Sequence, residues 1–240
     1  GLALWLAIGA DRERAQRVAG GSDDAAPPFL KITSAPGAEF APSLSPDGSQ
    51  VVYSAYVDVD GKGRTQLMLQ TTAPVEPRAL THPVAGEQDL MSAWSPDGRQ
   101  IAFYRVRREA GVRRESGAGS SCHLMLMASA GGEPHPVATC ESDRLRMFGW
   151  HPDGTQLVFG ASNAGQPGVN AIEVLDLAAG TSRKLDYAHA ASDLDLAPKY
   201  SPDGRWIAFQ RNVSRGDLWL VAAGGGQPER ATRIVSNPHG

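Results

Sequence analysis

Four stretches of the chain share one pattern of apolar and polar positions, seen in WSPDGRQIAF at residues 94–103. A large apolar residue precedes a polar Ser-Pro-Asp-Gly corner, and a run that ends in apolar residues follows it. Short apolar runs bounded by such corners are typical of β-strands joined by a tight turn. The pattern therefore predicts a two-stranded hairpin. It recurs as LSPDGSQVVY (44–53), WHPDGTQLVF (150–159) and YSPDGRWIAF (200–209).

Each corner residue suits one place in a three-residue hairpin turn. Proline presets φ for the first position of a type I turn, and aspartate suits the second position. Glycine then takes the left-handed conformation that closes the hairpin with a bulge. We therefore predict a structural role for all twelve corner residues. They are Pro46, Asp47, Gly48, Pro96, Asp97, Gly98, Pro152, Asp153, Gly154, Pro202, Asp203 and Gly204.

Large apolar residues stand five and seven positions after each corner proline. The pairs are Val51 and Tyr53, Ile101 and Phe103, Leu157 and Phe159, and Ile207 and Phe209. Residues two apart in a strand share a face, so each pair lies on one face. The residue between the two large ones is small and apolar, namely Val52, Ala102, Val158 or Ala208. This predicts that the second face is also covered, and that each sheet lies between other sheets.

The corner prolines are separated by 50, 56 and 50 residues, and two further short strands follow each hairpin. Third strands are predicted at 66–70, 123–128, 171–177 and 217–222, and fourth strands at 77–81, 135–140, 182–186 and 229–234. Four short antiparallel strands in each period are the signature of a β-propeller blade. We therefore predict an all-β propeller over 29–240, with blades near 38–82, 88–140, 144–187 and 194–234.

The repeats resemble those of a known propeller family. A large residue, Ser-Pro-Asp-Gly and Ile-Ala-Phe, followed by an apolar strand, Gly-Gly and Leu-Thr, is similar to the TolB-type repeat, a relative of the WD propellers. Pro42 and Pro198 occupy the family's proline position, whereas Ser92 and Phe148 depart from it. The resemblance spans residues 29–234. It implies the fold and says little of function, because such blades are reused in many proteins.

The chain opens with about ten apolar residues, GLALWLAIGA (1–10). A membrane span needs about 20 residues, so we interpret 1–10 as the end of a transmembrane or signal segment. A short buried helix or strand is the alternative. Residues 11–28 have the composition of a linker. Tethering to the membrane is therefore expected through the apolar segment.

The segment FLKITS (29–34) resembles a fourth strand with no strands of its own ahead of it. The last repeat already has a fourth strand, so FLKITS lacks a host among the four repeats. We therefore expect an incomplete ring, in which 29–34 does not join the sheet of 195–234. We also expect at least one further blade beyond residue 240, and six or more blades in the intact domain.

The two cysteines flank a predicted turn of the second repeat. Cys122 opens the third strand and Cys140 closes the fourth, so the two are opposed across a hairpin. Opposed Cβ atoms lie about 4.5–5.5 Å apart, close to the range of a disulfide. A pair of this kind favours a disulfide and an oxidising compartment; two buried free thiols are the alternative. With the apolar start, this predicts a periplasmic domain tethered to the bacterial inner membrane, with a secreted or cytoplasmic location as the alternative.

Composition and motifs narrow the classes of function. A net charge of −3 gives no basis for nucleic-acid binding through this region. The sequence has no G-x-S-x-G, no H-E-x-x-H, no C-x-x-C and no phosphate-binding glycine loop. The six histidines lack the spacing of metal ligands. We therefore predict that these residues have no catalytic activity, no cofactor and no metal.

Acidic residues stand seven positions before three of the four corner prolines. They are Glu39, Asp89 and Asp195, and Leu145 breaks the set. This position opens the first strand of a blade, the strand nearest the central channel. Three carboxylates there would attract cations or a basic segment of a partner. The alternative is that each caps a loop or bonds to the neighbouring blade.

The second repeat carries an arginine-rich insert at 105–122, which makes its period the longest. Arginine clusters bind phosphate or carboxylate groups. Here glutamates are interleaved with the arginines, and no aromatic residue is present to stack on bases. We therefore predict a solvated loop.

A propeller without catalytic motifs is typically a binding platform. The order of apolar segment, linker and blades resembles membrane-anchored transcriptional regulators of the CadC type, whose DNA-binding domain lies on the cytoplasmic side. This implies a sensor domain that receives a protein, peptide or small-molecule signal. One alternative is the substrate-gating propeller of a prolyl-oligopeptidase-type serine peptidase. The other is a TolB-like scaffold that binds envelope proteins.

Overall fold

The computed structural model describes residues 32–33, 37–59, 61–73, 75–108, 120–140, 147–162, 170–190, 193–212 and 217–232. The chain divides into two units, 1–34 and 35–240, and the strands belong to the second. The predicted segments 1–10 and 11–28 lie outside the described residues, as does 29–34 apart from residues 32 and 33. No helix that could cross a membrane is found in the described part of the chain.

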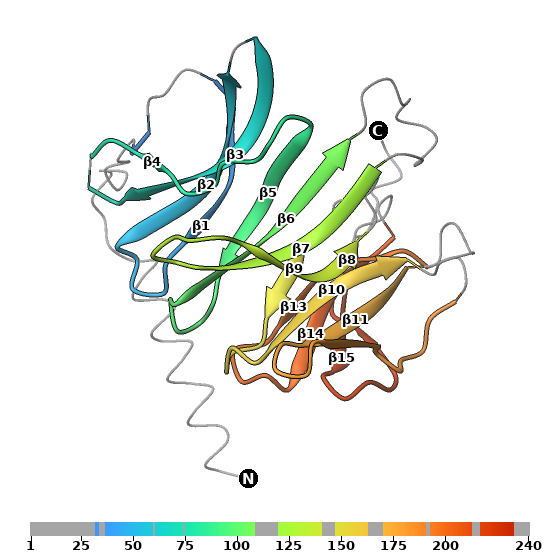
Figure 1. Cartoon of the computed structure of the whole chain (residues 1–240). Helices are drawn as coiled ribbons and strands as arrows, with labels where there is room; N and C mark the ends of the chain where they lie inside the picture. The colour runs from blue at the N-terminus through green and yellow to red at the C-terminus, as the bar shows by residue number, and fades with distance from the viewer. Residues whose placement is uncertain are drawn as a thin grey trace, which may run out of the picture. The chain divides into compact units, whose positions relative to one another are not determined.

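In the described residues, sixteen strands form four antiparallel sheets, each built from four strands that are consecutive in the chain. The sheets succeed one another along the sequence, from blue in sheet 1 to red in sheet 4 (Figure 1). Sheet 1 contains β1 (Glu39–Leu44), β2 (Gln50–Val59), β3 (Lys62–Thr71) and β4 (Arg78–Ala79). Sheet 2 contains β5 (Glu87–Trp94), β6 (Gln100–Arg108), β7 (Ser120–Ala128) and β8 (His135–Cys140). Sheet 3 contains β9 (Phe148–Trp150), β10 (Gln156–Ser162), β11 (Asn170–Asp176) and β12 (Thr181–Lys184). Sheet 4 contains β13 (Asp195–Tyr200), β14 (Trp206–Arg211), β15 (Asp217–Ala222) and β16 (Glu229–Arg230).

The arginine-rich insert is shorter than the sequence predicted. Arg105 and Arg107 lie in β6, and Ser120 to Cys122 lie in β7. The expectation of a loop beginning at residue 105 was therefore wrong. Arg105 instead lies in the sheet, where it pairs with Asp89 of β5. Residues 109–119 lie outside the described residues.

Neighbouring sheets pack through one recurring arrangement. The small residue of one sheet shares a buried cluster with the large pair of the next sheet. The clusters join Val52 to Ile101 and Phe103, Ala102 to Leu157 and Phe159, and Val158 to Ile207 and Phe209. Val52, Ala102 and Val158 are each 0% exposed. The second strands of sheets 1 to 3 are thus buried on both faces, which explains their nearly continuous apolar sequence.

Two tryptophan side chains also connect adjacent sheets. The Nε1 of Trp94 donates to the carbonyl oxygen of Ser43 at 3.1 Å. The Nε1 of Trp150 donates in the same way to the carbonyl oxygen of Ala93 at 3.2 Å. Each tryptophan is the large residue that precedes a corner. Its ring and its N–H therefore hold the first strands of successive sheets together.

Sheet 4 differs from the others because its second face is open. Ala208 is only partly buried, and Trp206 and Leu218 on the same face are 40% and 47% exposed. The described strands of sheet 4 share no buried cluster with those of sheet 1. The four sheets are therefore not closed into a ring, and the predicted all-β propeller fold is confirmed.

Candidate functional site

The three predicted carboxylates begin the first strands of sheets 1, 2 and 4. Glu39 opens β1, Asp195 opens β13, and Asp89 is the third residue of β5. Asp89 and Asp195 are both 0% exposed. A buried carboxylate is stable only when it is paired and hydrogen-bonded. The partners of each carboxylate therefore decide what this position can do.

Asp89 is held by an arginine of the same sheet. Arg105 lies directly opposite Asp89 on β6. Its Nε and Nη2 donate to the two carboxylate oxygens at 2.7 and 2.8 Å. Glu87 adds a second negative charge, 3.8 Å from the Arg105 Nε. These contacts, with the Asp89 hydrogen bond first, raise the pKa of Arg105.

Asp195 has the equivalent pairing, and a tyrosine of sheet 3 is added to it. Arg211 lies opposite Asp195 and donates to both oxygens at 2.8 and 2.9 Å. The Tyr187 hydroxyl donates to the Asp195 Oδ2 at 2.6 Å and accepts the Ile172 N–H at 3.3 Å. Burial, followed by the Asp195 hydrogen bond, raises the pKa of Tyr187. Tyr187 follows β12, so this hydroxyl links sheet 3 to sheet 4.

The Arg211 guanidinium also lies against aromatic rings. Its Cζ is 4.9 Å from the centre of the Trp219 ring and 5.3 Å from that of Phe209. Such stacking stabilises a cation while leaving the N–H groups free to donate. The guanidinium is therefore held by aromatic rings on its face and by hydrogen bonds at its edge.

Glu39 has no arginine opposite it, because Ala55 occupies that position. It lies close to Tyr53, and burial, followed by the charge of Glu39, raises the pKa of that tyrosine to about 12. The fourth position, Leu145, lies outside the described residues. Within the described part of the chain, Asp89 and Asp195 are bonded to arginine and tyrosine side chains. Asp89 and Asp195 thus each form an ion pair within their own sheet, and Asp195 is bonded in addition to Tyr187 of sheet 3.

Sequence reasoning missed the two arginines, although a signal was present. Asp89 and Arg105 are 16 residues apart, as are Asp195 and Arg211. The shared spacing places both partners at equivalent positions of repeats two and four. Arg105 was instead grouped with the arginines of the insert.

A bulge follows each acidic residue. In sheets 1, 2 and 4, two residues of the first strand oppose the second large residue of the next strand. The first bulged residue is left-handed in each case, with φ of 51° at Ala41, 56° at Met91 and 50° at Ala197. The second is Pro42, Ser92 or Pro198. Proline suits a bulge because it has no N–H to pair. Phe148, the departure in sheet 3, pairs directly with Phe159 and joins the apolar cluster instead.

The corners repeat one hydrogen-bond pattern in three of the four sheets. The hydroxyls of Ser45, Ser95 and Ser201 each donate to the aspartate two residues later at 2.6 Å. In each corner the glycine N–H donates to the carbonyl oxygen three residues earlier, at 2.9 Å. The φ values are 70° at Gly48, 71° at Gly98, 77° at Gly154 and 70° at Gly204. These residues are placed as a turn requires, and none of them points to a ligand.

The corner of sheet 3 has His151 in place of serine. Its Nδ1 lies 2.7 Å from the Asp153 Oδ1, and its ring meets Tyr200 of sheet 4 edge-on at 4.7 Å. Gly204 leaves the space that the imidazole occupies, because a Cβ there would lie 2.5 Å from the Nε2. His151 therefore contacts the next sheet, in addition to closing its own turn.

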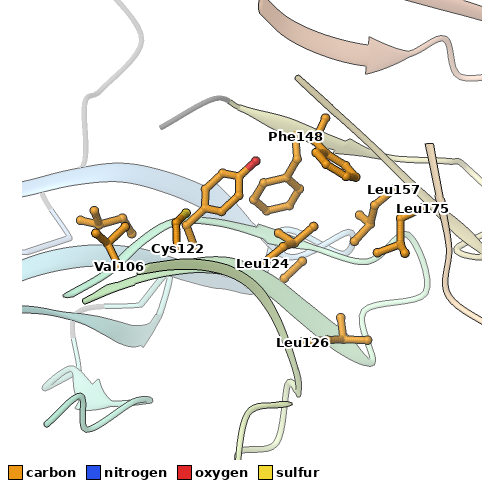
Figure 2. Packing of buried hydrophobic residues seen from close by; sticks show 11 residues of the cluster. Val106, Cys122, Leu124, Leu126, Phe148, Leu157 and Leu175 are labelled. Carbon is orange, nitrogen blue, oxygen red and sulfur yellow. The ribbon is translucent and has the colours of Figure 1, made fainter. Parts of the chain in front are cut away.

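The two cysteines form the expected disulfide. Cys122 and Cys140 are directly opposite each other on β7 and β8, with Cα atoms 4.9 Å apart. Cys122 is buried in the cluster between sheets 2 and 3. Phe148 of sheet 3 and Leu124 of sheet 2 point toward one another in this cluster (Figure 2). The described residues include no group of three His, Cys, Asp or Glu side chains that could hold a metal ion.

Several curated proteins share part of the sequence, and no family model matches the chain. The uncharacterized protein YidR of Escherichia coli K12 is 30% identical over 164 residues, which cover 63% of this chain and 35% of that protein. The uncharacterized peptidase YuxL of Bacillus subtilis is 23% identical over 211 residues, covering 73% of this chain and 30% of the peptidase. The chain thus spans about a third of the length of these relatives.

Solved structures share the fold. A protein of Agrobacterium tumefaciens described as TolB matches with a TM-score of 0.62 and 24% identity, covering 85% of this chain and 65% of that one. TolB of Acinetobacter baumannii matches with a TM-score of 0.56 and 20% identity, covering 80% and 43%. The β-propeller domain of the trilobed protease of Pyrococcus furiosus matches with a TM-score of 0.53 and 14% identity, covering 83% and 59%. These likenesses show a TolB-like β-propeller fold.

Proposed function

We propose that this chain is the non-catalytic, signal-receiving propeller of a membrane-anchored transcriptional regulator of the CadC type, placed outside the inner membrane. The observation that carries the location is the Cys122–Cys140 disulfide, because such bonds persist in oxidising compartments. The TolB-like fold supports a binding role. The regulator role is supported by the order of apolar segment 1–10, linker 11–28 and blades.

Recognition of the partner is assigned to the loops at the strand ends. Asp89 and Asp195 are neutralised by arginines and fully buried, so they offer little attraction to a cation. Loops on a rigid scaffold vary without disturbing the packed sheets. The partner is a protein, a peptide or a small molecule, and these residues bind no nucleic acid.

The location is tested in cells that make the complete natural protein. Thiols are trapped with an alkylating polymer, and spheroplasts are then treated with protease. We expect Cys122 and Cys140 to resist alkylation until they are reduced. We also expect the protein to be found in the membrane fraction, and protease added outside the spheroplasts to digest the propeller. Free thiols together with protection from protease would rule out the proposed location.

The regulator role is tested by deleting residues 35–240 from the complete protein. We expect the membrane fraction still to contain the shortened protein, while transcription no longer responds to the inducing condition. A set of transcripts that is unchanged between the two strains under every condition tried would contradict the regulator role, and would leave a TolB-like envelope scaffold as the better proposal.

A second candidate is the propeller of a serine peptidase of the prolyl-oligopeptidase kind. The similarity to the peptidase YuxL and to the propeller of the trilobed protease favours it. In that case a catalytic serine lies in another part of the complete protein. Labelling of the complete protein by a fluorophosphonate probe, with cleavage of a chromogenic prolyl peptide, would replace the regulator proposal by this one.

A further inference from the structure

The outer strand of three sheets is held by a side-chain hydroxyl. The Thr81 Oγ1 accepts the Leu67 N–H at 3.0 Å in sheet 1. The Tyr187 hydroxyl accepts the Ile172 N–H at 3.3 Å in sheet 3, and the Thr232 Oγ1 accepts the Leu218 N–H at 2.9 Å in sheet 4. Each hydroxyl follows a fourth strand, and each N–H belongs to the equivalent residue of a third strand. These contacts fasten strands that are only two to four residues long.

Sheet 2 is fastened differently. Its third-strand residue equivalent to Leu67 is Leu124, since both lie opposite the residue eight positions after the corner proline. Two residues before Leu124 stands Cys122, joined to Cys140 at the end of β8. The pairing of β8 with β7 is also irregular between Leu124 and Met125. A covalent bond thus lies beside the place where the other sheets have a hydroxyl contact.

The strand held by this bond covers an apolar cluster. Val137 and Ala138 of β8 pack against the cluster that contains Leu124 and Leu126. Figure 2 shows Cys122, Leu124 and Leu126 within this cluster, together with Phe148 of sheet 3. If β8 left the sheet, one side of the cluster would be uncovered.

We propose that the Cys122–Cys140 disulfide makes β8 a redox-sensitive strand: it is docked when the bond is intact and released when the bond is reduced. A dithiol supplies the two electrons and two protons. One of its thiolates attacks the Cys140 Sγ, which belongs to the less buried cysteine, and Cys122 leaves as the thiolate. The second thiol of the reagent then closes its own disulfide and releases Cys140. This inference goes beyond the proposed function and does not depend on it.

The experiment compares hydrogen exchange in the oxidised and the dithiothreitol-treated protein without denaturant. We expect the amides of residues 135 and 137–140 to exchange at least tenfold faster after reduction, while those of β4 and β16 keep their rates. A dye that fluoresces on apolar surfaces should bind to the reduced form. The double variant Cys122→Ser, Cys140→Ser should exchange quickly at β8 without any reductant.

Thr81→Val is the matched variant, because it removes the hydroxyl contact of sheet 1 and leaves sheet 2 intact. We expect it to speed exchange at β4, with no response to dithiothreitol there. A disulfide that resists the dithiol in the folded protein would overturn the proposal. So would reduction that leaves β8 exchange unchanged, or that speeds all four sheets equally. These results decide the matter even if the double serine variant fails to fold.

Discussion

At the scale of single residues, the corner glycines share a conformation and differ in their surroundings. Gly48 and Gly204 both have a φ of 70°. A Cβ at Gly48 would meet nothing within 4 Å, whereas one at Gly204 would meet the ring of His151. Glycine is thus required in sheet 1 for its backbone conformation alone. In sheet 4 it is required both for its conformation and for the space that His151 occupies. The sequence predicts the first requirement, which belongs to the turn, and gives no sign of the second.

Replacing these glycines by alanine separates the two requirements. Gly48→Ala should cost about 1–2 kcal/mol, the strain of a left-handed alanine. Gly204→Ala should cost about 1 kcal/mol more, because His151 must leave Asp153 and Tyr200 to make room. Urea unfolding of both variants measures the difference. Adding His151→Ser should remove the extra cost at residue 204 and change nothing at residue 48; equal costs at the two glycines would contradict the assigned role of His151.

Acid sensitivity at the corners follows from the Asp47 carboxylate. Hydrogen bonds, first from the Ser45 hydroxyl and then from Ser49, lower its pKa from 3.8 to about 2. A lowered pKa in the folded state means that Asp47 stabilises the fold above pH 3.8 and loses this effect as the pH falls toward about 2. Asp47→Asn should therefore be less stable than the natural chain at pH 5, and the gap should narrow on acidification. Unfolding curves over this range test it; a gap independent of pH would contradict the prediction.

At the scale of elements, the first two strands of sheets 2 and 4 are joined by buried ion pairs. Asp195 is 0% exposed and Arg211 only 10% at the side chain, so neither can turn to solvent without leaving the other. Repeat three has Leu145 and Ala161 at the same two positions. In the sequence of repeat three, apolar residues thus replace both members of the ion pair. In sheets 2 and 4 the arginine is needed because a buried aspartate is already present opposite it.

Replacing only the arginine of the pair should destabilise the fold more than replacing both residues. Arg211→Ala leaves a buried carboxylate without its cation, which we expect to cost about 3–5 kcal/mol. The double variant Asp195→Leu, Arg211→Ala copies repeat three and should cost clearly less than the single variant. Thermal unfolding compares them. A double variant at least as unstable as Arg211→Ala would show that the charge pair itself, and not the unpaired carboxylate, dominates.

The sequence predicts the four sheets well because turn residues and apolar spacing are local signals. It predicts the bulges poorly. Alanine and methionine do not favour a φ near 50°, so the residue types at Ala41, Met91 and Ala197 do not predict a left-handed conformation. The bulge depends on contacts across the sheet, where two residues face one aromatic side chain. The pairing of Asp89 with Arg105 is similarly invisible to a motif search, since it joins two strands through a shared spacing.

At the scale of the whole molecule, stability comes from repeated contacts between sheets. A small residue of one sheet and a large pair of the next fill each interface, so the size of the small residue sets how closely the sheets approach. The sequence has a small apolar residue at this position in all four repeats, namely Val52, Ala102, Val158 and Ala208. It does not show which of the four is covered, because coverage depends on the neighbouring sheet.

Enlarging the same position in two sheets tests this dependence directly. Ala102→Leu places three more carbon atoms in the cluster beside Leu157 and Phe159, where Ala102 is 0% exposed. We expect a loss of about 1–3 kcal/mol from overpacking. Ala208→Leu makes the same change in a second strand of the same kind, on the partly exposed face beside Trp206 and Leu218. It should alter the free energy of unfolding by no more than about 0.5 kcal/mol. Urea denaturation of both variants measures the contrast. Equal losses would mean that the backbone, and not the neighbouring sheet, limits the size of this residue, which would contradict the packing of sheet 3 against Ala102.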